Sequence, residues 1–194
     1  IALKKMDKIS SAIFKIEEAL DKKICKNLSE YIEIRPMQKA TLLKDGKDIQ
    51  DTKHRNVYNY GLNEKDEHDL LYKKLIFSTC SDAIKKYQKI FSSLHQELKL
   101  ESINLLKYVE GNFYKKHIDA FHKVNRQLSF IINLNEDYKG GELIFYYPHN
   151  EQFAYSKIEL KTGDLVMFPS NFMYPHSVQP IISGIRYSIV CWFS

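Results

Sequence analysis

The second half of the chain repeats one pattern, short apolar segments separated by glycine or proline, and this pattern limits the folds that the chain can adopt. Strand-like segments occupy residues 103–109, 127–134, 142–147, 154–160, 164–168 and 186–193. The breaks between them fall at Gly111, Gly140, Gly141, Pro148, Gly163, Pro169, Pro175 and Gly184. Turns at such short intervals are typical of a β-barrel or sandwich. Because no long helical pattern interrupts them, a parallel sheet with crossover helices is not expected.

The first half of the chain predicts two helices with little regular structure between them. Residues 21–32 carry apolar side chains at the spacing of an amphipathic helix, with Asp21 as its N-cap. Residues 66–98 keep a three-four spacing and predict one long helix that lies against the sheet. Residues 10–20 predict an entering strand. Residues 38–66 predict strand, loop and strand, and we expect this stretch to act as a lid over the substrate.

Composition limits the partners and the compartment. The net charge of +5 is mild and spread along lysine-rich stretches, so a nucleic-acid partner is not expected. No apolar run approaches the roughly 18 residues of a membrane span, so no membrane partner is expected either. No CxxC pair is present among the three cysteines, Cys25, Cys80 and Cys191. We expect each cysteine to be a small buried residue, and the protein to lie in the cytoplasm or another reducing compartment. The chain opens at Ile1, so an upstream leader is not excluded, and no oligomeric state is predicted.

Two histidines and an aspartate predict a metal site. His117 and Asp119 are two residues apart in a strand-like run, so both side chains would project from one face. His176 is the leading candidate for a third ligand. Two imidazoles and one carboxylate with open positions suit non-haem Fe(II), and zinc also fits such a set. Arg186, ten residues beyond His176, would be a buried cation that needs a carboxylate partner, for which a bound dicarboxylate is the candidate.

Three motifs in this order resemble the Fe(II)- and 2-oxoglutarate-dependent oxygenases, in particular their prolyl 4-hydroxylase-like branch. They are YxxGxFYxxHxD over 108–119, INLNEDYKGGELIFY over 132–146, and GDLVMFPSNFMYPHSVQPIISGIRYSIVCWF over 163–193. The resemblance implies a double-stranded β-helix, a jelly roll, buttressed by the N-terminal helices. It also implies a single domain over residues 1–194, with a support region and possible lid up to about residue 98 and a catalytic core from about residue 99.

The resemblance assigns roles to four side chains of these motifs, with a fifth beside them. It implies that His117, Asp119 and His176 hold Fe(II). It further implies that Arg186 pairs with the distal carboxylate of 2-oxoglutarate, with possible help from Ser188 on the same strand face.

Four further residues are candidates for contact with the cosubstrate or the substrate by the same resemblance. Tyr108 takes the position of a cosubstrate-contacting tyrosine. Asn133 stands where many prolyl 4-hydroxylases have tyrosine, and it either points into the pocket or is a satisfied buried amide. Tyr114 and Trp192 are candidates to face the substrate, although each equally suits barrel closure or core packing. His54, His68, His95, His122 and His149 are expected at the surface.

The function implied is a dioxygenase reaction in which 2-oxoglutarate is decarboxylated to succinate and CO2 while a prolyl residue of a peptide or protein is hydroxylated. Fe(II), 2-oxoglutarate and O2 would take part, with ascorbate as an activator. The alternatives are hydroxylation of a free amino acid or other small molecule, and a non-catalytic metal-binding interaction module. Oxidative demethylation of nucleic acid is disfavoured because no basic-aromatic platform for a flipped base is evident.

Overall fold

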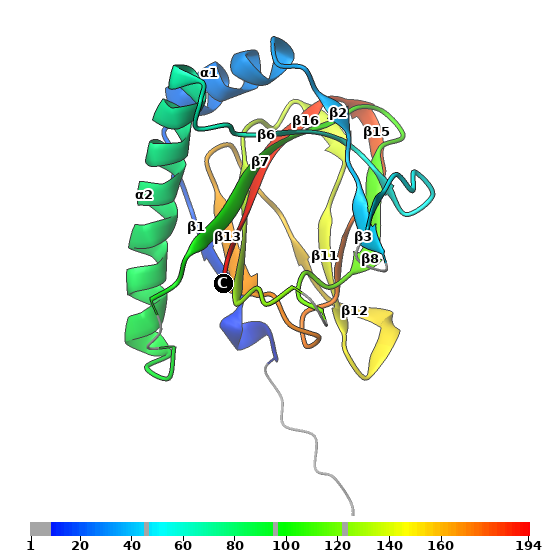
Figure 1. The fold of residues 1–194 in the computed structure, drawn as a ribbon. Coiled ribbons are helices and arrows are strands. Elements are labelled where there is room, and N and C mark those ends of the chain that lie inside the picture. The colour runs from blue at the N-terminus through cyan, green and yellow to red at the C-terminus, as the bar shows by residue number, and fades with distance from the viewer. Residues whose placement is uncertain (1–8, 45–46, 95–96, 122–123) are drawn as a thin grey trace, which may run out of the picture.

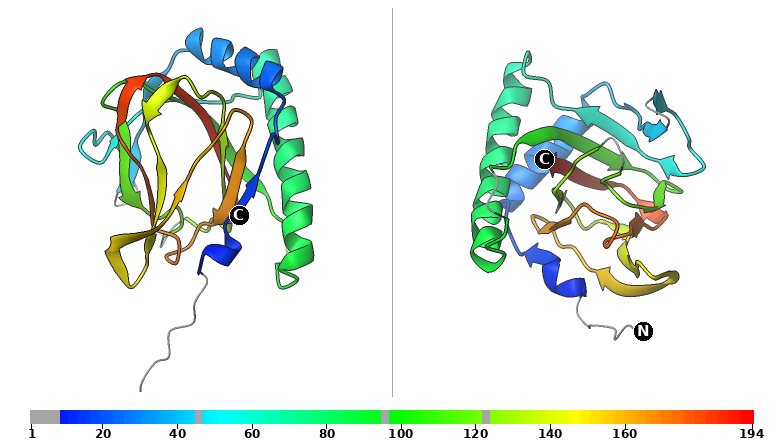
Figure 2. Two further views of the ribbon diagram at one scale, coloured as in Figure 1. Left: turned by 180° about the vertical axis from the view of Figure 1, so that it is seen from behind. Right: turned by 60° about the horizontal axis from the view of Figure 1, so that its bottom comes forward.

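The computed structural model describes residues 9–44, 47–94, 97–121 and 124–194. Two antiparallel sheets face each other, and two helices pack on the outer side of the larger sheet (Figures 1 and 2). The larger sheet has the order β1-β13-β9-β16-β7-β6-β2, and the smaller β12-β11-β14-β8-β5. This is the jelly-roll arrangement expected from the sequence.

Among the regular elements, the strands are short except for β7, β12 and β16, and α2 is twice as long as α1. After a 3-10 turn at Ile9–Ala12 they are β1 Phe14–Ile16, α1 Lys22–Glu33, β2 Gln38–Lys39, β3 Leu42–Lys44, β4 Lys47–Ile49, β5 Arg55–Asn56, β6 Tyr58–Gly61, α2 Glu67–Ile90, β7 Leu100–Tyr108, β8 Phe113–His117, β9 Leu128–Asn133, β10 Tyr138–Gly140, β11 Leu143–Tyr147, β12 Asn150–Ile158, β13 Leu165–Pro169, β14 His176–Val178, β15 Ile181–Gly184 and β16 Arg186–Phe193.

The side chains of the central strand β16 point alternately into two separate hydrophobic cores. Ile189, Cys191 and Phe193 point outward into the core beneath the helices. Val190 and Trp192 point inward into the core between the two sheets. Successive side chains of a strand face opposite sides of its sheet, so every second residue of β16 faces the space between the sheets. That space contains the candidate site.

The two helices begin where the sequence predicts, but the second ends earlier. The Asp21 carboxylate accepts the backbone N–H of Lys23, as an N-cap does, and Asp66 caps α2 in the same way. The prediction of one helix over 66–98 is wrong at its C-terminus, because α2 ends at Ile90. The Phe91 ring packs against Phe14 and Tyr87, and the serines that follow are poor helix formers.

The helices are fixed to the sheet through a buried carboxylate. Asp69 on α2 is fully buried and accepts hydrogen bonds from Tyr31 on α1, at 2.6 Å, and from Tyr60 on β6, at 2.7 Å. The backbone N–H of Asn63 is a third donor, at 2.9 Å. One side chain therefore links both helices to an outer strand of the larger sheet.

Residues 38–66 contain more regular structure than the predicted strand, loop and strand. β2 and β6 extend the larger sheet, β5 pairs with β8 at the edge of the smaller one, and β3 and β4 form a hairpin. The stretch therefore bridges the two sheets at one end of the barrel (Figure 1). Its action as a lid stays a prediction.

The later strands fall close to their predicted ranges, and the six residue segments correspond to β7, β9, β11, β12, β13 and β16. The short pair β10 and β15 was not predicted, because its strands carry little apolar periodicity. Gly140 and Gly141 both have positive φ and form the turn between β10 and β11. Among the described residues, no helix is both long enough and apolar enough to span a membrane.

Candidate active site

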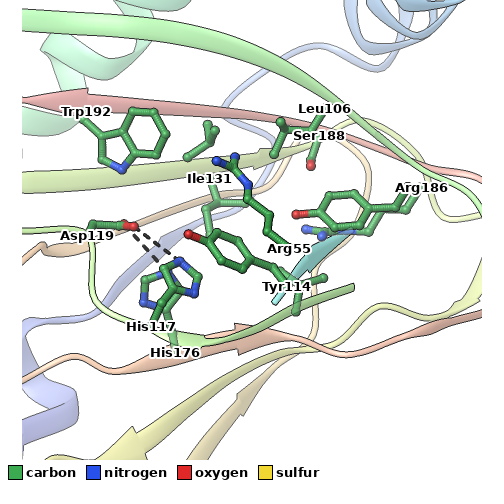
Figure 3. A pocket seen from close by; sticks show the side chains of 13 residues that line it. Arg55, Leu106, Tyr114, His117, Asp119, Ile131, His176, Arg186, Ser188 and Trp192 are labelled. Atoms are coloured by element: carbon green, nitrogen blue, oxygen red, sulfur yellow. Dashed lines mark ion pairs between the residues drawn. The ribbon is translucent and has the colours of Figure 1, made fainter. Parts of the chain in front are cut away.

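The two predicted histidine ligands are paired directly across two strands. β8 and β14 are antiparallel neighbours, and His117 at the end of β8 lies opposite His176 at the start of β14. With Asp119 they form a group in which one ligand atom of each residue lies within 4.8 Å of the others. The Asp119 carboxylate lies 3.4 Å from His117 Nε2 and 3.7 Å from His176 Nε2 (Figure 3).

Asp119 reaches this group from a bend and not from the strand. The prediction that His117 and Asp119 share one strand face is wrong, because β8 ends at His117. Beyond that point β14 offers no further partner residue, and the chain turns inward. The backbone N–H of Ala120 then donates to the Ser170 carbonyl at 2.9 Å. The carboxylate is thereby buried to 6% exposure, although its neighbour Ile118 is half-buried.

Hydrogen bonds orient both imidazoles for metal binding. His117 Nδ1 lies 2.8 Å from the Lys115 carbonyl, and His176 Nδ1 lies 3.0 Å from the Tyr174 carbonyl. A carbonyl only accepts, so each Nδ1 carries a proton, and each Nε2 is the nitrogen left to bind a metal beside Asp119. Metal-bound histidines use this arrangement, in which the distal N–H is held by a carbonyl.

Buried serines hold the Asp119 carboxylate in its charged form. Ser129 Oγ donates to Asp119 Oδ2 at 2.6 Å, and Ser129 and Ser170 hydroxyls are 2.7 Å apart. Burial alone would raise the pKa of Asp119, but His176, His117 and the Ser129 hydroxyl outweigh it and lower that pKa. Burial, together with His117, lowers the pKa of His176 to about 4. A charged carboxylate beside two neutral imidazoles is the state that binds a divalent cation.

Arg186 lies at the opposite end of a small cavity of about 30 Å³ between the sheets. Its side chain is 1% exposed, and Nε donates to Asn133 Oδ1 at 3.2 Å. The second terminal nitrogen, Nη2, is buried without a hydrogen-bond partner, and no carboxylate of the described residues lies within 4 Å of the guanidinium. A buried unpaired guanidinium is costly, so the cavity fits a ligand that brings a carboxylate.

The remaining cosubstrate candidates lie around that guanidinium. Tyr108 and Ser188 line the cavity, and the Tyr108 ring centre is 5.3 Å from the Arg186 guanidinium carbon. Asn133 does not line it. Its amide accepts from Arg186 and Tyr138 and donates to two backbone carbonyls, so it is a satisfied buried amide that positions Arg186.

Tyr114 and Trp192 border both the cavity and a wider groove of about 760 Å³ that opens beside the metal ligands. The Tyr114 ring stacks on the His117 ring at 3.5 Å between centroids. Trp192 also packs in the inner core, with the Arg126 guanidinium 3.8 Å from its ring centre. The Tyr114 and Trp192 side chains therefore lie between the cavity and the groove.

Sequence patterns did not reveal several residues of this site. Arg55 borders the cavity and the groove from β5, and Ser129 and Ser170 stand behind Asp119. Arg55 and Ser129 lie outside the three motifs, and Ser170 lies within the motif over 163–193 but carries no role there, because each residue reaches the site from a separate element. Among the other histidines, His54, His68 and His149 are exposed as predicted, and His54 also borders the groove, while His95 and His122 lie outside the described residues.

The donor set matches Fe(II) chemistry with a keto-acid cosubstrate. Two imidazole nitrogens and one carboxylate on one face leave open positions, which is the ligand set of non-haem iron oxygenases. The unpaired Arg186 supplies the counterpart of a distal carboxylate inside the same cavity. The residues present thus suit both groups together.

Comparisons with known proteins agree with this geometry. The model of the 2OG-Fe(II) oxygenase superfamily matches residues 103–194. A PKHD-type hydroxylase of Prochlorococcus marinus (strain MIT 9215) is 30% identical over 168 residues, which span 80% of this chain and 72% of that relative. Other PKHD-type hydroxylases align over shorter stretches, between 30% and 42% of their own length.

Two solved structures share the fold. A prolyl hydroxylase of Trichoplax adhaerens, in complex with a hypoxia inducible factor peptide fragment, superposes with a TM-score of 0.75 at 18% identity, over 94% of this chain and 83% of that one. A Pseudomonas putida prolyl-4-hydroxylase gives a TM-score of 0.71 at 20% identity, over 94% and 91%. The chain therefore belongs to the 2OG-Fe(II) oxygenase superfamily, as a prolyl hydroxylase-like dioxygenase that uses Fe(II), 2-oxoglutarate and O2.

Proposed function

We propose that this dioxygenase hydroxylates a prolyl residue within a peptide or protein. The observation that carries the proposal is the groove of about 760 Å³ that opens beside the metal ligands. Its lining includes Thr41 and Asp51 as well as His117, Phe121 and Val124, so residues from separate parts of the chain border it together with two of the metal ligands, His117 and Asp119. A free amino acid needs only a small enclosed pocket, whereas a groove of this size accepts several residues of an extended chain.

In this proposal His117, Asp119 and His176 hold Fe(II), and Arg186 binds the distal carboxylate of 2-oxoglutarate. Once bound, iron and 2-oxoglutarate supply the oxidising chemistry with O2, producing succinate, CO2 and a hydroxylated substrate carbon. The protein positions these groups and excludes water. Ile131, Val190 and Trp192 form apolar walls of the cavity, which keep solvent from the reacting atoms.

The relatives support prolyl hydroxylation as the reaction. The Trichoplax adhaerens neighbour is a prolyl hydroxylase that was solved with a peptide fragment, and it shares the fold of this chain. Its peptide is not assigned to this protein. What supports a polypeptide substrate here is the groove, together with the Fe(II) and carboxylate sites that it borders.

The test incubates the protein with Fe(II), 2-oxoglutarate, ascorbate and a panel of proline-rich peptides, and measures succinate and peptide mass. We expect a gain of one oxygen, located on proline by fragmentation. His176→Ala should abolish peptide-dependent succinate formation, whereas the exposed His68→Ala should not change it. The proposal fails if wild-type protein forms succinate only with a free amino acid, or if the added oxygen is on another residue.

A further inference from the structure

Arg55 is a second arginine at the site, and it approaches from the side opposite Arg186. It lies on β5, where it pairs in register with Tyr114 of β8, at the edge of the smaller sheet. Arg186 belongs to β16 in the larger sheet. Figure 3 shows both side chains among the residues that line the cavity. Unlike Arg186, Arg55 also lines the outer groove, so it stands at the boundary between the two spaces.

Its guanidinium is held in place but is not ion-paired. Nη1 donates to the Thr41 carbonyl at 2.9 Å, and the guanidinium carbon lies 4.8 Å from the centre of the Tyr114 ring. No carboxylate of the described residues lies within 4 Å of it, although Asp51 and Glu101 border the same groove. Those two acids already pair with His54 and Arg126.

Unpartnered donors gather at this boundary. Five buried side-chain nitrogen or oxygen atoms lack a hydrogen-bond partner within the described part of the chain, and three of them belong to residues that line the cavity. These three are Arg55 Nε, Arg186 Nη2 and Trp192 Nε1. All are nitrogens that only donate. A ligand that satisfies them must bring acceptors, because a buried donor without a partner costs about 1–3 kcal/mol.

The three donors fall into two groups by position. Arg186 lies at the inner end of the cavity, away from the groove, and serves the cosubstrate carboxylate. Arg55 and Trp192 line both the cavity and the groove, where the substrate passes the metal ligands. Proline has no backbone N–H, so a prolyl segment offers the enzyme carbonyl oxygens and few donors. Hydrogen-bond donors on the protein would therefore pair with the carbonyl oxygens of such a segment.

We propose that Arg55 Nε donates a hydrogen bond to a main-chain carbonyl oxygen of the polypeptide substrate next to the oxidised residue, with Trp192 Nε1 as a second donor. This rests on the proposed polypeptide substrate. The contact positions the substrate and takes no part in cosubstrate binding. It also assigns a purpose to residues 38–66, which bring Arg55 to the site from outside the barrel core.

The test separates substrate binding from cosubstrate binding in Mn(II)-loaded protein. Trp192 is the single tryptophan of the chain, so its fluorescence reports ligands at this boundary. The probes are 2-oxoglutarate and the proline-rich peptide that gains oxygen in the assay above. Arg55→Ala should weaken peptide binding about 10- to 100-fold, the range for a hydrogen bond to a charged group, and leave 2-oxoglutarate binding within twofold. Arg186→Gln should show the reverse pattern.

Two control variants and one altered peptide test whether the effect of Arg55→Ala comes from loss of this hydrogen bond. Arg55→Lys should recover part of the peptide affinity, and Lys53→Ala, an exposed neighbour, should change neither ligand. A peptide in which the carbonyl before the target proline is replaced by CH2 should bind wild type more weakly than the unaltered peptide does. Its affinity should be the same for wild type and for Arg55→Ala. This wild-type measurement with the altered peptide remains informative if Arg55→Ala does not fold.

The outcomes are distinct from those of the proposed function. Equal peptide binding by wild type and Arg55→Ala overturns the Arg55 contact while prolyl hydroxylation stands. A matching loss of 2-oxoglutarate affinity shows instead that Arg55 serves the cosubstrate. A peptide with aspartate beside the target proline is a further probe. If this aspartate raises the affinity for wild type but not for Arg55→Ala, Arg55 binds an acidic side chain of the substrate, and the carbonyl contact is overturned. Wild-type protein that oxidises no peptide overturns both proposals.

Discussion

At the scale of single residues, the position of Asp119 depends on contacts that its sequence neighbours do not provide. The HxD spacing places the aspartate two residues beyond His117, but the bend after β8 and two buried serines decide where its oxygens lie. Ser129 occupies Oδ2, which leaves Oδ1, 3.4 Å from His117 Nε2, as the freer oxygen for a metal. Residues of this kind fix the geometry of a metal site without touching the metal.

We therefore predict that Ser129→Ala weakens metal binding about 10- to 100-fold, the usual effect of removing an outer hydrogen bond to a ligand. Without the hydroxyl, the carboxylate is free to rotate and to offer both oxygens. Titration of the metal-free protein with Co(II), followed by its visible absorption, measures the affinity. Ser129→Thr should restore it, and the exposed Ser183→Ala is the control. Unchanged affinity in Ser129→Ala would show that Asp119 is positioned by its backbone alone.

At the scale of elements, the helices support the sheet through packing and through polar contacts, among which the Asp69 junction is fully buried. Alternate residues of β7, β9 and β16 fill the core beneath the helices, and their neighbours in sequence line the site. Cys80 of α2 and Cys191 of β16 meet here, with their sulfurs 3.5 Å apart. A disturbance of the helix layer thus reaches the strand that carries Arg186 through a single layer of side chains.

The Asp69 junction should contribute strongly to stability. Asp69→Asn turns one acceptor oxygen into a donor that faces either the Tyr31 hydroxyl or the Tyr60 hydroxyl, and we expect a loss of about 2–3 kcal/mol in the free energy of unfolding. Urea denaturation measures this loss. Asp82→Asn on the exposed face of α2 should change stability by less than about 0.5 kcal/mol. Equal effects of the two substitutions would contradict the role given to Asp69.

At the scale of the whole molecule, carboxylates with lowered pKa values make the fold sensitive to acid. Burial alone would raise the pKa of Asp164, but Lys15 and the backbone N–H groups of Lys161 and Glu18 outweigh it and lower that pKa. Burial would likewise raise the pKa of Glu33, but hydrogen bonds from Lys107 and Tyr187 outweigh burial and lower that pKa. The Lys15–Asp164 pair connects β1 to the residue before β13, and the Lys107–Glu33 pair connects α1 to the larger sheet, so each pair joins two different elements.

The sign of the pH dependence follows from these shifts. A carboxylate with a lower pKa in the folded state stabilises the fold above its unfolded pKa, near 4, and loses that contribution as the pH falls through the folded value. We therefore expect the free energy of unfolding to fall from about pH 6.5 downward, because the unfolded chain protonates His176 before the folded chain does, and to fall further below pH 4 as these carboxylates are protonated. Urea denaturation across this range tests it. Asp164→Asn should make the acid slope shallower, and an unaltered slope would exclude Asp164 as a contributor.

The sequence by itself determined the class of fold and the identity of the central side chains. Period-two apolar segments broken by glycine and proline can bury their apolar faces only in a closed or layered sheet, and β16 occupies its predicted range. Motif spacing likewise predicted His117, Asp119, His176 and Arg186, because chemistry limits which residue types can hold a metal or pair with a carboxylate, and the structure brings the first three together.

Only the tertiary structure decided how those side chains are held and what else joins them. Arg55, Ser129 and Ser170 come from elements separated by up to 115 positions in the chain, and long-range packing brings them to one place. Local periodicity cannot encode such contacts, since it reports which face of a strand is buried and not what that face meets. For the same reason the sequence left Asn133 undecided between pocket and core, whereas its four hydrogen bonds place it behind Arg186.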